Sequence, residues 1–323
     1  MSLGLNVIET TWLLLVILFF LAVSIHTISL YLPNECEKSQ AFILFQDLIR
    51  YGKTKKSKRD TWLRVFDIPK RWFWHFYAVS VLWNGLLVVV SLRAIQRDEP
   101  YPSWLTDTLS FLAGSPATHG QAPQVCSVAV QVLLWIHCLR RLAECLYVSV
   151  FSDGVIHVVQ YVFGLGYYIL LGLTVLCWDR MTGGKVEGCM VSLGSPAPPV
   201  LAQLGVVQAA GVLLFGWASL LQHRSLITLA RMRTGASGAV ETLAHRVPSG
   251  GWFELVSCPH YLAELLIYVS LSLVSGGVSL TWGLVVLYVL FNQVLAALLC
   301  HQFYRSKFES YPQHRKALIP FIL

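Results

Sequence analysis

Charged side chains are scarce in this sequence. Asp, Glu, Lys and Arg make up 13% of its 323 residues, whereas 55% are hydrophobic and the mean hydropathy is +0.60. Soluble domains carry roughly 25% charged residues, so the composition excludes a soluble globular protein with an ordinary surface. The 11 Trp, 13 Tyr and 16 Phe supply side chains for the aromatic belts at a membrane–water interface. We therefore predict a polytopic membrane protein.

Several motifs of soluble enzymes are missing as well. The eight cysteines include no C-x-x-C pair and no Cys/His cluster with zinc spacing, so no metal site is predicted. No G-x-G-x-x-G segment follows a strand pattern, which excludes a Rossmann domain. The net charge of +7 is not accompanied by a nucleic-acid-binding motif, so no nucleic-acid partner is predicted.

Long apolar runs are abundant. A hydrocarbon core about 30 Å thick requires about 20 apolar residues in a helix, and long runs of this kind form helices in lipid. Seven such runs occur, at 11–32, 73–95, 125–148, 155–178, 200–222, 261–278 and 280–303. The last two could be divided differently, which leaves the count open by one. The first has no basic start and no cleavage site, so we expect a retained span and not a signal peptide.

The basic residues between these runs predict an orientation. Twenty Lys and Arg residues fall on one side of the membrane and four on the other when the runs are threaded in order. The richer side holds residues 33–72, 140–141, 223–260 and 304–323. Because basic loops stay in the cytosol, we expect an all-α protein with a lumenal N-terminus and a cytosolic C-terminus. The positive net charge follows from this topology.

The connections on the predicted lumenal side are rich in Gly, Pro and Ser. Residues 97–124 and 179–199 have this composition and are expected to be loops. Cys126 and Cys189 fall at or in these two connections and could form a disulfide.

Polar residues interrupt the apolar pattern on the predicted cytosolic side. In the stretch 42–58, Gln46 and Asp47 precede a basic cluster. A carboxylate beside hydrocarbon needs a partner or a function, whereas the lysines that follow could simply face anionic headgroups. In the stretch 135–152, Arg140 and Arg141 lie four and three residues before Glu144, a spacing at which helical side chains meet. Arginines that snorkel from a helix end would give the same pattern.

Two further stretches lie on the same side. Gly250 and Gly251 allow close approach of the backbone to a ligand, and His260 and Glu264 follow at a spacing of four residues. The tail, residues 301–323, is basic and aromatic, and its prolines prevent one continuous helix. Because all four stretches fall on one side, we expect them to form one site. Phosphates and an adenine ring would account for both the arginines and the aromatic residues.

These stretches resemble a known family. The matching segments are "FQDLIRYGKTK" (45–55), "HCLRRLAECLYVSVFS" (137–152), "IHVVQY" (156–161), "HRVPSGGWFELVSCPHYLAEL" (245–265) and "HQFYRSKFESYPQHRKALIPFIL" (301–323). They are similar to the steroid 5-alpha-reductase family over nearly the whole chain. The first segment narrows the resemblance to the polyprenal reductase branch, which acts in dolichol synthesis for protein N-glycosylation.

The resemblance implies an enzyme of the endoplasmic reticulum membrane with seven helices that binds NADPH from the cytosol. It implies one reductase domain over residues 1–323, with the lipid substrate on the side of 1–178 and NADPH in 200–323. Mapped by motif, the expected NADPH contacts are Arg141, Gln222, Arg233, Arg246, His260, Glu264, Tyr304 and Arg315. His301 is expected to be catalytic.

The implied reaction needs a carbonyl group. Hydride adds readily to an alkene only when a conjugated carbonyl accepts the developing negative charge, so polyprenal is a suitable substrate and polyprenol is not. We expect hydride at the β-carbon, an enolate held by hydrogen-bond donors, protonation at the α-carbon, and dolichal as the product. Steroids with a 3-oxo-4-ene group, such as testosterone, are expected as side substrates.

Three positions depart from the steroid branch, one of them His260, where the branch has an asparagine. Its Gln-Glu pair is replaced by Gln46 and Asp47, and Cys138 stands where it has a tyrosine. We expect Gln46 and Asp47 to be catalytic and to contact the substrate, together with Tyr51, His137 and Cys138. The proton donor is left open among Asp47, Tyr51 and His137.

Two other classes of protein fit part of the pattern. Isoprenylcysteine methyltransferases resemble the C-terminal half, and a lipid carrier without catalytic activity would share the composition. Protection of the protein from unfolding by NADPH would distinguish the reductase from both.

Overall fold

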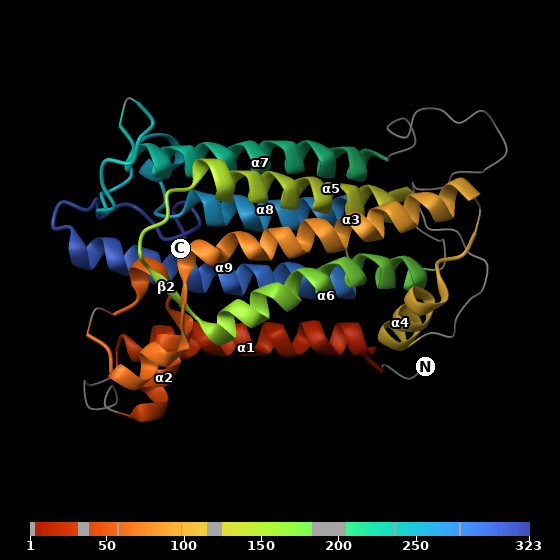
Figure 1. Cartoon of the computed structure of the whole chain (residues 1–323), viewed down its shortest axis with the longest axis horizontal. Helices are drawn as coiled ribbons and strands as arrows, with labels where there is room; N and C mark the ends of the chain where they lie inside the picture. Colours follow the sequence, from red (N-terminus) through yellow and green to blue (C-terminus); the bar gives the residue numbers. More distant parts are fainter. Residues whose placement is uncertain are drawn as a thin grey trace.

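The structure is an all-α bundle, as the sequence predicts (Figure 1). A computed structural model describes residues 4–31, 39–56, 58–97, 99–114, 125–182, 205–235, 237–277 and 279–323. Its helices are α1 (Val7–Ser29), α2 (Gln40–Ile49), α3 (Trp74–Arg97), α4 (Ser103–Ala113), α5 (Val125–Ala143), α6 (Val158–Thr182), α7 (Val206–Arg231), α8 (Pro259–Val274) and α9 (Leu280–Lys307). Two short strands, β1 (Asp67–Pro69) and β2 (Val155–His157), pair in an antiparallel ladder.

Six helices of the described residues are long and apolar enough to cross a membrane: α1, α3, α5, α6, α7 and α9. The seventh predicted span corresponds to α8, which has 16 residues. A helix of this length rises about 24 Å, which is less than a hydrocarbon core of about 30 Å. The chain is therefore a multi-pass membrane protein, and the count of seven spans and their orientation stay predictions.

Packing between the described helices is dominated by four contacts. α7 lies along α8, α3 lies against α5 and α6, and α1 lies along α9. Gly211 of α7 makes the first contact possible, because a Cβ atom there would lie 2.8 Å from a methyl group of Val274 and 2.9 Å from the Ser270 carbonyl oxygen. Between α1 and α6, the indole of the fully buried Trp12 donates to Thr174 at 2.9 Å.

One of the two predicted lumenal loops contains a helix, and the other lies largely outside the described residues. The stretch 97–124 contains α4, so the expectation of a loop there was wrong for residues 103–113. Leu105, Leu109 and Ala113 are buried, with the i, i+4 spacing of one helix face. The stretch 179–199 lies largely outside the described residues, as does Cys189. Cys126 is disulfide-bonded, and its pairing with Cys189 stays a prediction.

The chain between α1 and α3 folds over one end of the bundle. We call residues 39–73 together with 149–157 the cap; it contains α2, three 3₁₀ turns and the β1–β2 pair. Gly52 has a φ of +53°, and a Cβ on Gly154 would lie 2.8 Å from the Gly52 Cα, so the two glycines allow the backbones to touch. Figure 1 shows the cap and the chain between α7 and α8 at one end of the bundle, and α4 at the other.

The C-terminal tail joins the same end. α9 ends at Lys307, before Pro312 and Pro320, as those prolines predict. The tail turns back and forms a parallel bridge between Lys316 and Val256, supported by backbone hydrogen bonds of 3.0 Å to Leu255 and 2.8 Å from Ser257. The end of the chain is thereby fixed against the segment that precedes α8.

Candidate active site

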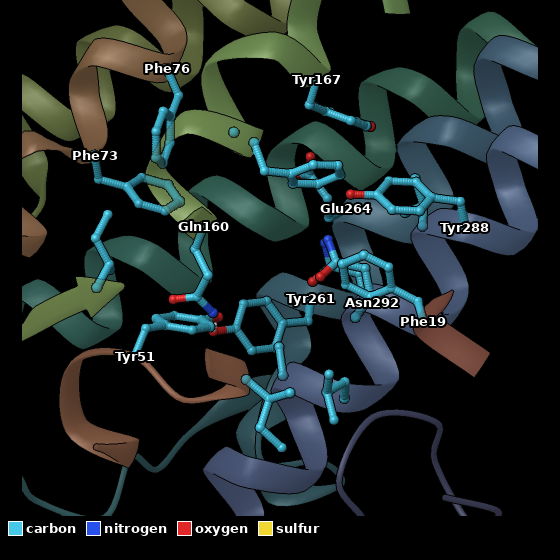
Figure 2. A pocket seen from close by; sticks show the side chains of 18 of the residues that line it. Phe19, Tyr51, Phe73, Phe76, Gln160, Tyr167, Tyr261, Glu264, Tyr288 and Asn292 are labelled. Atoms are coloured by element: carbon cyan, nitrogen blue, oxygen red, sulfur yellow. Dashed lines mark hydrogen bonds between the residues drawn. The ribbon is translucent and has the colours of Figure 1, made fainter. Parts of the chain in front are cut away.

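A cavity of about 420 Å³ opens inside the bundle next to the cap. Its wall is largely aromatic, with side chains from α1, α3, α6, α8 and α9 that point into it (Figure 2). The aromatic residues are Phe19, Phe45, Tyr51, Phe73, Phe76, Tyr77, Phe163, Tyr167, Tyr168, Tyr261, Tyr268 and Tyr288. Such a wall suits an apolar ligand and places several hydroxyl groups at its surface.

One part of the wall is polar. Arg141 of α5, Gln222 of α7, and His260 and Glu264 of α8 line the cavity together. The Gln222 amide donates to a Glu264 carboxylate oxygen at 2.5 Å and to the His260 carbonyl oxygen at 3.3 Å. Nδ1 of His260 is buried and has no hydrogen-bond partner among the described residues. The polar part therefore joins three helices and still has an unused ring nitrogen.

The two arginines of α5 are held by one carboxylate. Oε1 of Glu144 accepts from Arg140 at 2.6 Å, and its other oxygen pairs with Arg141 at 2.5 Å. The predicted contacts at i, i+3 and i, i+4 are thus confirmed. Nε of Arg141 also donates to the hydroxyl of Tyr77 at 3.2 Å, and the guanidinium lies 5.0 Å from the centre of that ring. Arg141 therefore links the ion pair to the aromatic wall.

His137 and Cys138 lie behind the wall, not in it. Both are fully buried on α5 and neither lines the cavity. Nε2 of His137 lies 3.4 Å from Glu264, and the Cys138 sulfur accepts from Ser80 at 2.8 Å. Of the expected substrate contacts, only Tyr51 lines the cavity, where its hydroxyl is 2.8 Å from that of Tyr261.

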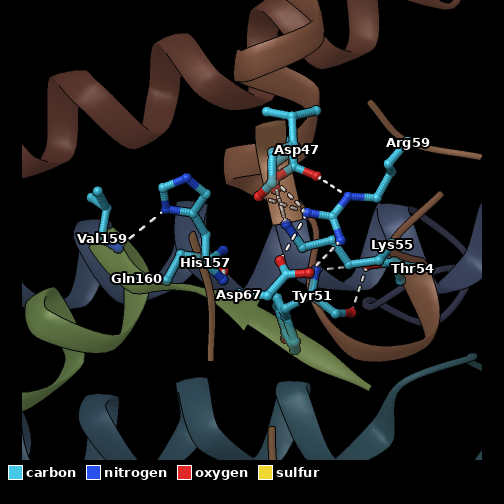
Figure 3. Close-up of polar contacts among 10 residues, drawn as sticks. Asp47, Tyr51, Thr54, Lys55, Arg59, Asp67, His157, Val159 and Gln160 are labelled. Carbon is cyan, nitrogen blue, oxygen red and sulfur yellow. Dashed lines mark hydrogen bonds and ion pairs between the residues drawn. The ribbon is translucent and has the colours of Figure 1, made fainter. Parts of the chain in front are cut away.

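Gln46 and Asp47 also lie outside the cavity wall, although Phe45, Leu48 and Ile49 of the same helix α2 line it. Asp47 forms ion pairs with Lys55 at 2.7 Å and with Arg59 at 2.6 Å (Figure 3). Gln46 accepts two hydrogen bonds from Arg50. Each carboxylate oxygen of Asp47 thus contacts a cation, so the structure does not place Asp47 as an acid for a substrate carbonyl. Lys55 therefore contacts a buried carboxylate and does not face anionic headgroups.

Three cations lie at the cap, and none of them lines the cavity. Nζ of Lys53 donates to the Tyr304 hydroxyl at 2.7 Å, and Nζ of Lys70 lies 5.4 Å from the centre of the Tyr51 ring. Arg233 donates to the Val150 carbonyl oxygen. Within the described residues none of these three cations forms an ion pair with a carboxylate.

The positive charges of this group affect the pKa of a neighbouring histidine, His245. Burial, followed by the charges of Arg233 and Lys53, lowers the pKa of His245 to about 4. The region therefore favours a bound anion. Lys53, Lys70 and His245 were missed as site residues in the sequence, although Lys53 and His245 lie in the matching segments 45–55 and 245–265.

The remaining predicted residues belong to the tail and its neighbours. Nδ1 of His301 lies 2.6 Å from the Ser257 hydroxyl, which in turn contacts Tyr311 at 2.5 Å. Arg315 donates to the Pro248 carbonyl oxygen and pairs with Glu254. These contacts hold the tail in place, and neither His301 nor Arg315 lines the cavity. Arg246 is exposed.

Comparison with known proteins now adds to this geometry. The model of the 3-oxo-5-alpha-steroid 4-dehydrogenase family matches residues 186–323. A polyprenal reductase of Danio rerio is 54% identical over 99% of this chain and 99% of its own. Polyprenal reductases of Xenopus tropicalis and Homo sapiens are 50% and 45% identical, over 98% and 99% of this chain and 99% and 96% of theirs.

The chain belongs to the polyprenal reductase branch of the steroid 5-alpha-reductase family. The resemblance inferred from the motifs is confirmed. Members of this family are oxidoreductases that act on a CH–CH group and generally use a nicotinamide cofactor. The comparisons thus favour a reductase over a methyltransferase or a lipid carrier.

Proposed function

We propose that this protein reduces the α-isoprene double bond of polyprenal with NADPH and releases dolichal, in the membrane of the endoplasmic reticulum. The supporting observation is the cavity itself: an aromatic wall meets a polar part that contains Glu264, Gln222 and the unused nitrogen of His260. The cavity is lined from both halves of the chain, so we propose one reductase domain over residues 1–323.

The residues present fit a dinucleotide phosphate. Lys53, Lys70 and Arg233 lie at the cap without carboxylate partners among the described residues, and charge-assisted bonds to phosphate are strong. Tyr304 and Tyr311, whose stacked rings are 5.6 Å apart, are buried beside Lys53 and fix the position of that cation. These cations come from 53–70 as well as from 200–323, so the proposed cofactor site extends beyond the C-terminal half.

The polar part of the cavity fits a carboxamide. A nicotinamide group needs one acceptor for its NH₂ and one donor for its oxygen, and Glu264 and His260 supply these chemistries on adjacent turns of α8. When bound, NADPH supplies the hydride, while the protein supplies orientation and electrostatics.

Tyr77 is the residue that we propose for the carbonyl oxygen. Its side chain is 4% exposed and lines the cavity, and its oxygen accepts from Arg141 at 3.2 Å. A hydroxyl that accepts from a guanidinium is polarised and keeps its own proton for donation. It can therefore hold the enolate oxygen as charge develops there. We propose that the Tyr77 hydroxyl has the role of the tyrosine that the steroid branch carries at the position of Cys138.

The aromatic wall would hold the reacting isoprene unit. A cavity of about 420 Å³ accommodates the head of the lipid and not a long chain, so the tail must extend into the bilayer. The conjugated aldehyde is required by the chemistry, because the allylic alcohol offers no acceptor for the charge that hydride transfer creates.

The test is NADPH-dependent reduction by the purified full-length protein in lipid nanodiscs, with polyprenal, polyprenol and testosterone supplied separately. We expect conversion of polyprenal to dolichal, no reaction with polyprenol and slow reaction with testosterone. Faster turnover of testosterone would replace the substrate assignment, and no oxidation of NADPH with any of the three would refute the proposed function.

A further inference from the structure

Gln46 and Asp47 brace one short loop from two sides. Arg50 donates to Gln46 at 3.1 and 3.0 Å and also reaches the Thr54 carbonyl oxygen at 3.4 Å. Nζ of Lys55 donates to both the side chain of Asp47 at 2.7 Å and its backbone oxygen at 2.8 Å. The start and the end of the loop 50–55 are therefore tied to the same turn of α2.

Arg59 extends this arrangement to the strand pair. It lies between Asp47 at 2.6 Å and Asp67 of β1 at 2.8 Å. The side chains of Asp47, Lys55 and Arg59 are 4%, 6% and 9% exposed, and that of Asp67 is 17% exposed. The network contains two carboxylates and two cationic side chains, so its charges balance (Figure 3). Ion pairs sequestered from water to this degree have defined geometry, because an unpaired charge there is costly.

The loop carries two groups of the proposed site. Tyr51 reaches the cavity and lies 2.8 Å from the Tyr261 hydroxyl. Lys53 points to Tyr304 of α9 at 2.7 Å. Thr54 follows these two residues and closes the turn. Its hydroxyl accepts from the Tyr51 amide at 3.1 Å and donates to the Tyr51 carbonyl oxygen at 2.9 Å. The side chains of Tyr51 and Lys53 are thus set by the loop, and the loop by α2.

We infer that Gln46 and Asp47 are positioning residues. They hold the loop 50–55 so that Lys53 faces the phosphates of the dinucleotide and Tyr51 faces the substrate, and the Asp47 carboxylate transfers no proton. The identity of the ligands rests on the proposed function; the brace itself rests on the contacts above.

The test compares Lys55→Ala, Lys55→Arg and Asp47→Asn in the full-length protein in nanodiscs, with Lys58→Ala, an exposed neighbour, as the control. For Lys55→Ala we expect faster hydrogen exchange of the amides of residues 50–55 and a Kd for NADPH raised about tenfold, or about 1.4 kcal/mol. The kcat at saturating NADPH should stay within about threefold of the wild type, because no donor to the substrate is lost. Lys55→Arg should restore the Kd, and Lys58→Ala should change neither quantity.

Three outcomes would overturn the inference or separate it from the proposed function. A loss of kcat in Asp47→Asn with an unchanged Kd would make Asp47 a proton donor. A lower Tm in Lys55→Ala with unchanged exchange and Kd would make the network purely structural. Faster exchange of the loop in a protein whose wild type binds no NADPH would confirm the brace and refute the cofactor.

Discussion

Tyr77 connects the arginines of α5 to the space where a carbonyl would lie. Among the described residues of the cavity wall, it is the hydroxyl that accepts a hydrogen bond from a guanidinium, that of Arg141. We expect Tyr77→Phe to lower kcat with polyprenal about 100-fold, the loss typical of one donor to an oxyanion. The Kd for NADPH should not change, because the ring remains. Steady-state kinetics and cofactor titration of the purified protein measure the two quantities.

A matched control is Tyr147→Phe, since Tyr147 is 86% exposed on the π-helical turn Glu144–Val148 after α5. It should behave like the wild type. If Tyr77→Phe retains full kcat, the hydrogen bond from Arg141 has no catalytic role and the donor must be sought at the Tyr51–Tyr261 pair.

The pKa of His245 predicts how the stability of the protein and its affinity for NADPH depend on pH. Its pKa of about 4 in the free protein lies below the ordinary value, so the folded state resists protonation. This group therefore costs stability as the pH falls from about 6.5 towards 4. A phosphate bound beside it would raise its pKa towards the ordinary value, so binding would take up a proton and NADPH should bind more tightly as the pH falls from about 6.5 towards 4.

Isothermal titration in buffers of different ionisation enthalpy measures this proton uptake. His245→Ala should abolish the part of the uptake that belongs to this ring, whereas His314→Ala, an exposed histidine of the tail, should not. Equal proton uptake in His245→Ala and the wild type would place the phosphates away from His245.

At the scale of elements, the contact between α7 and α8 sets the polar part of the cavity, because Gln222 and Glu264 come from these two helices. Gly211 allows that contact. Gly211→Ala should lower the Tm and weaken NADPH binding, since the added Cβ would lie 2.9 Å from the Ser270 carbonyl oxygen and force the helices apart.

Gly216→Ala on the same helix is the matched control. A Cβ at Gly216 meets nothing within 4 Å, and alanine favours a helix interior by up to about 1 kcal/mol over glycine. Its Tm should be equal or higher. The Tm of each variant is measured by thermal unfolding in the same detergent. An unchanged Tm in Gly211→Ala would mean that α8 shifts to accept the methyl group.

The long helices were predictable from the sequence, and the small elements were not. Runs of about 20 apolar residues leave few alternatives in lipid, and the predicted spans correspond to α1, α3 and α5 to α9. The helix α4 carried a periodic signal in Leu105, Leu109 and Ala113 that its Gly- and Pro-rich surroundings concealed. The strands β1 and β2 have three residues each and pair across 90 positions (Asp67 with His157), which no local pattern reveals.

The site was predictable where a motif fixes a helix face and not where a loop decides. Arg141, Gln222, His260 and Glu264 line one cavity, and their role as NADPH contacts stays a prediction. Gln46 and Asp47 were placed by likeness to a Gln-Glu pair, but the face of α2 that they occupy depends on Lys55 and Arg59, which follow in a loop.

For the whole molecule, the arrangement at the two ends of the bundle makes orientation the decisive property. The cap, to which Lys53 and Lys70 belong, and the tail share one end, and α4 lies at the other (Figure 1). The excess of basic residues predicts that the first end lies in the cytosol, where NADPH would reach Lys53 directly. With the opposite orientation the cofactor would have to come from the lumen.

Single cysteines at exposed positions test this orientation. Ser310 lies in the tail and Asp107 on α4, and both are exposed. In sealed microsomes, Ser310→Cys should react at once with a membrane-impermeant maleimide, and Asp107→Cys only after permeabilisation. The free cysteines of the described residues are buried, so the unmodified protein gives the background. The reverse pattern would place the cations in the lumen and would require a lumenal source of NADPH, so this labelling constrains the proposed function without measuring turnover.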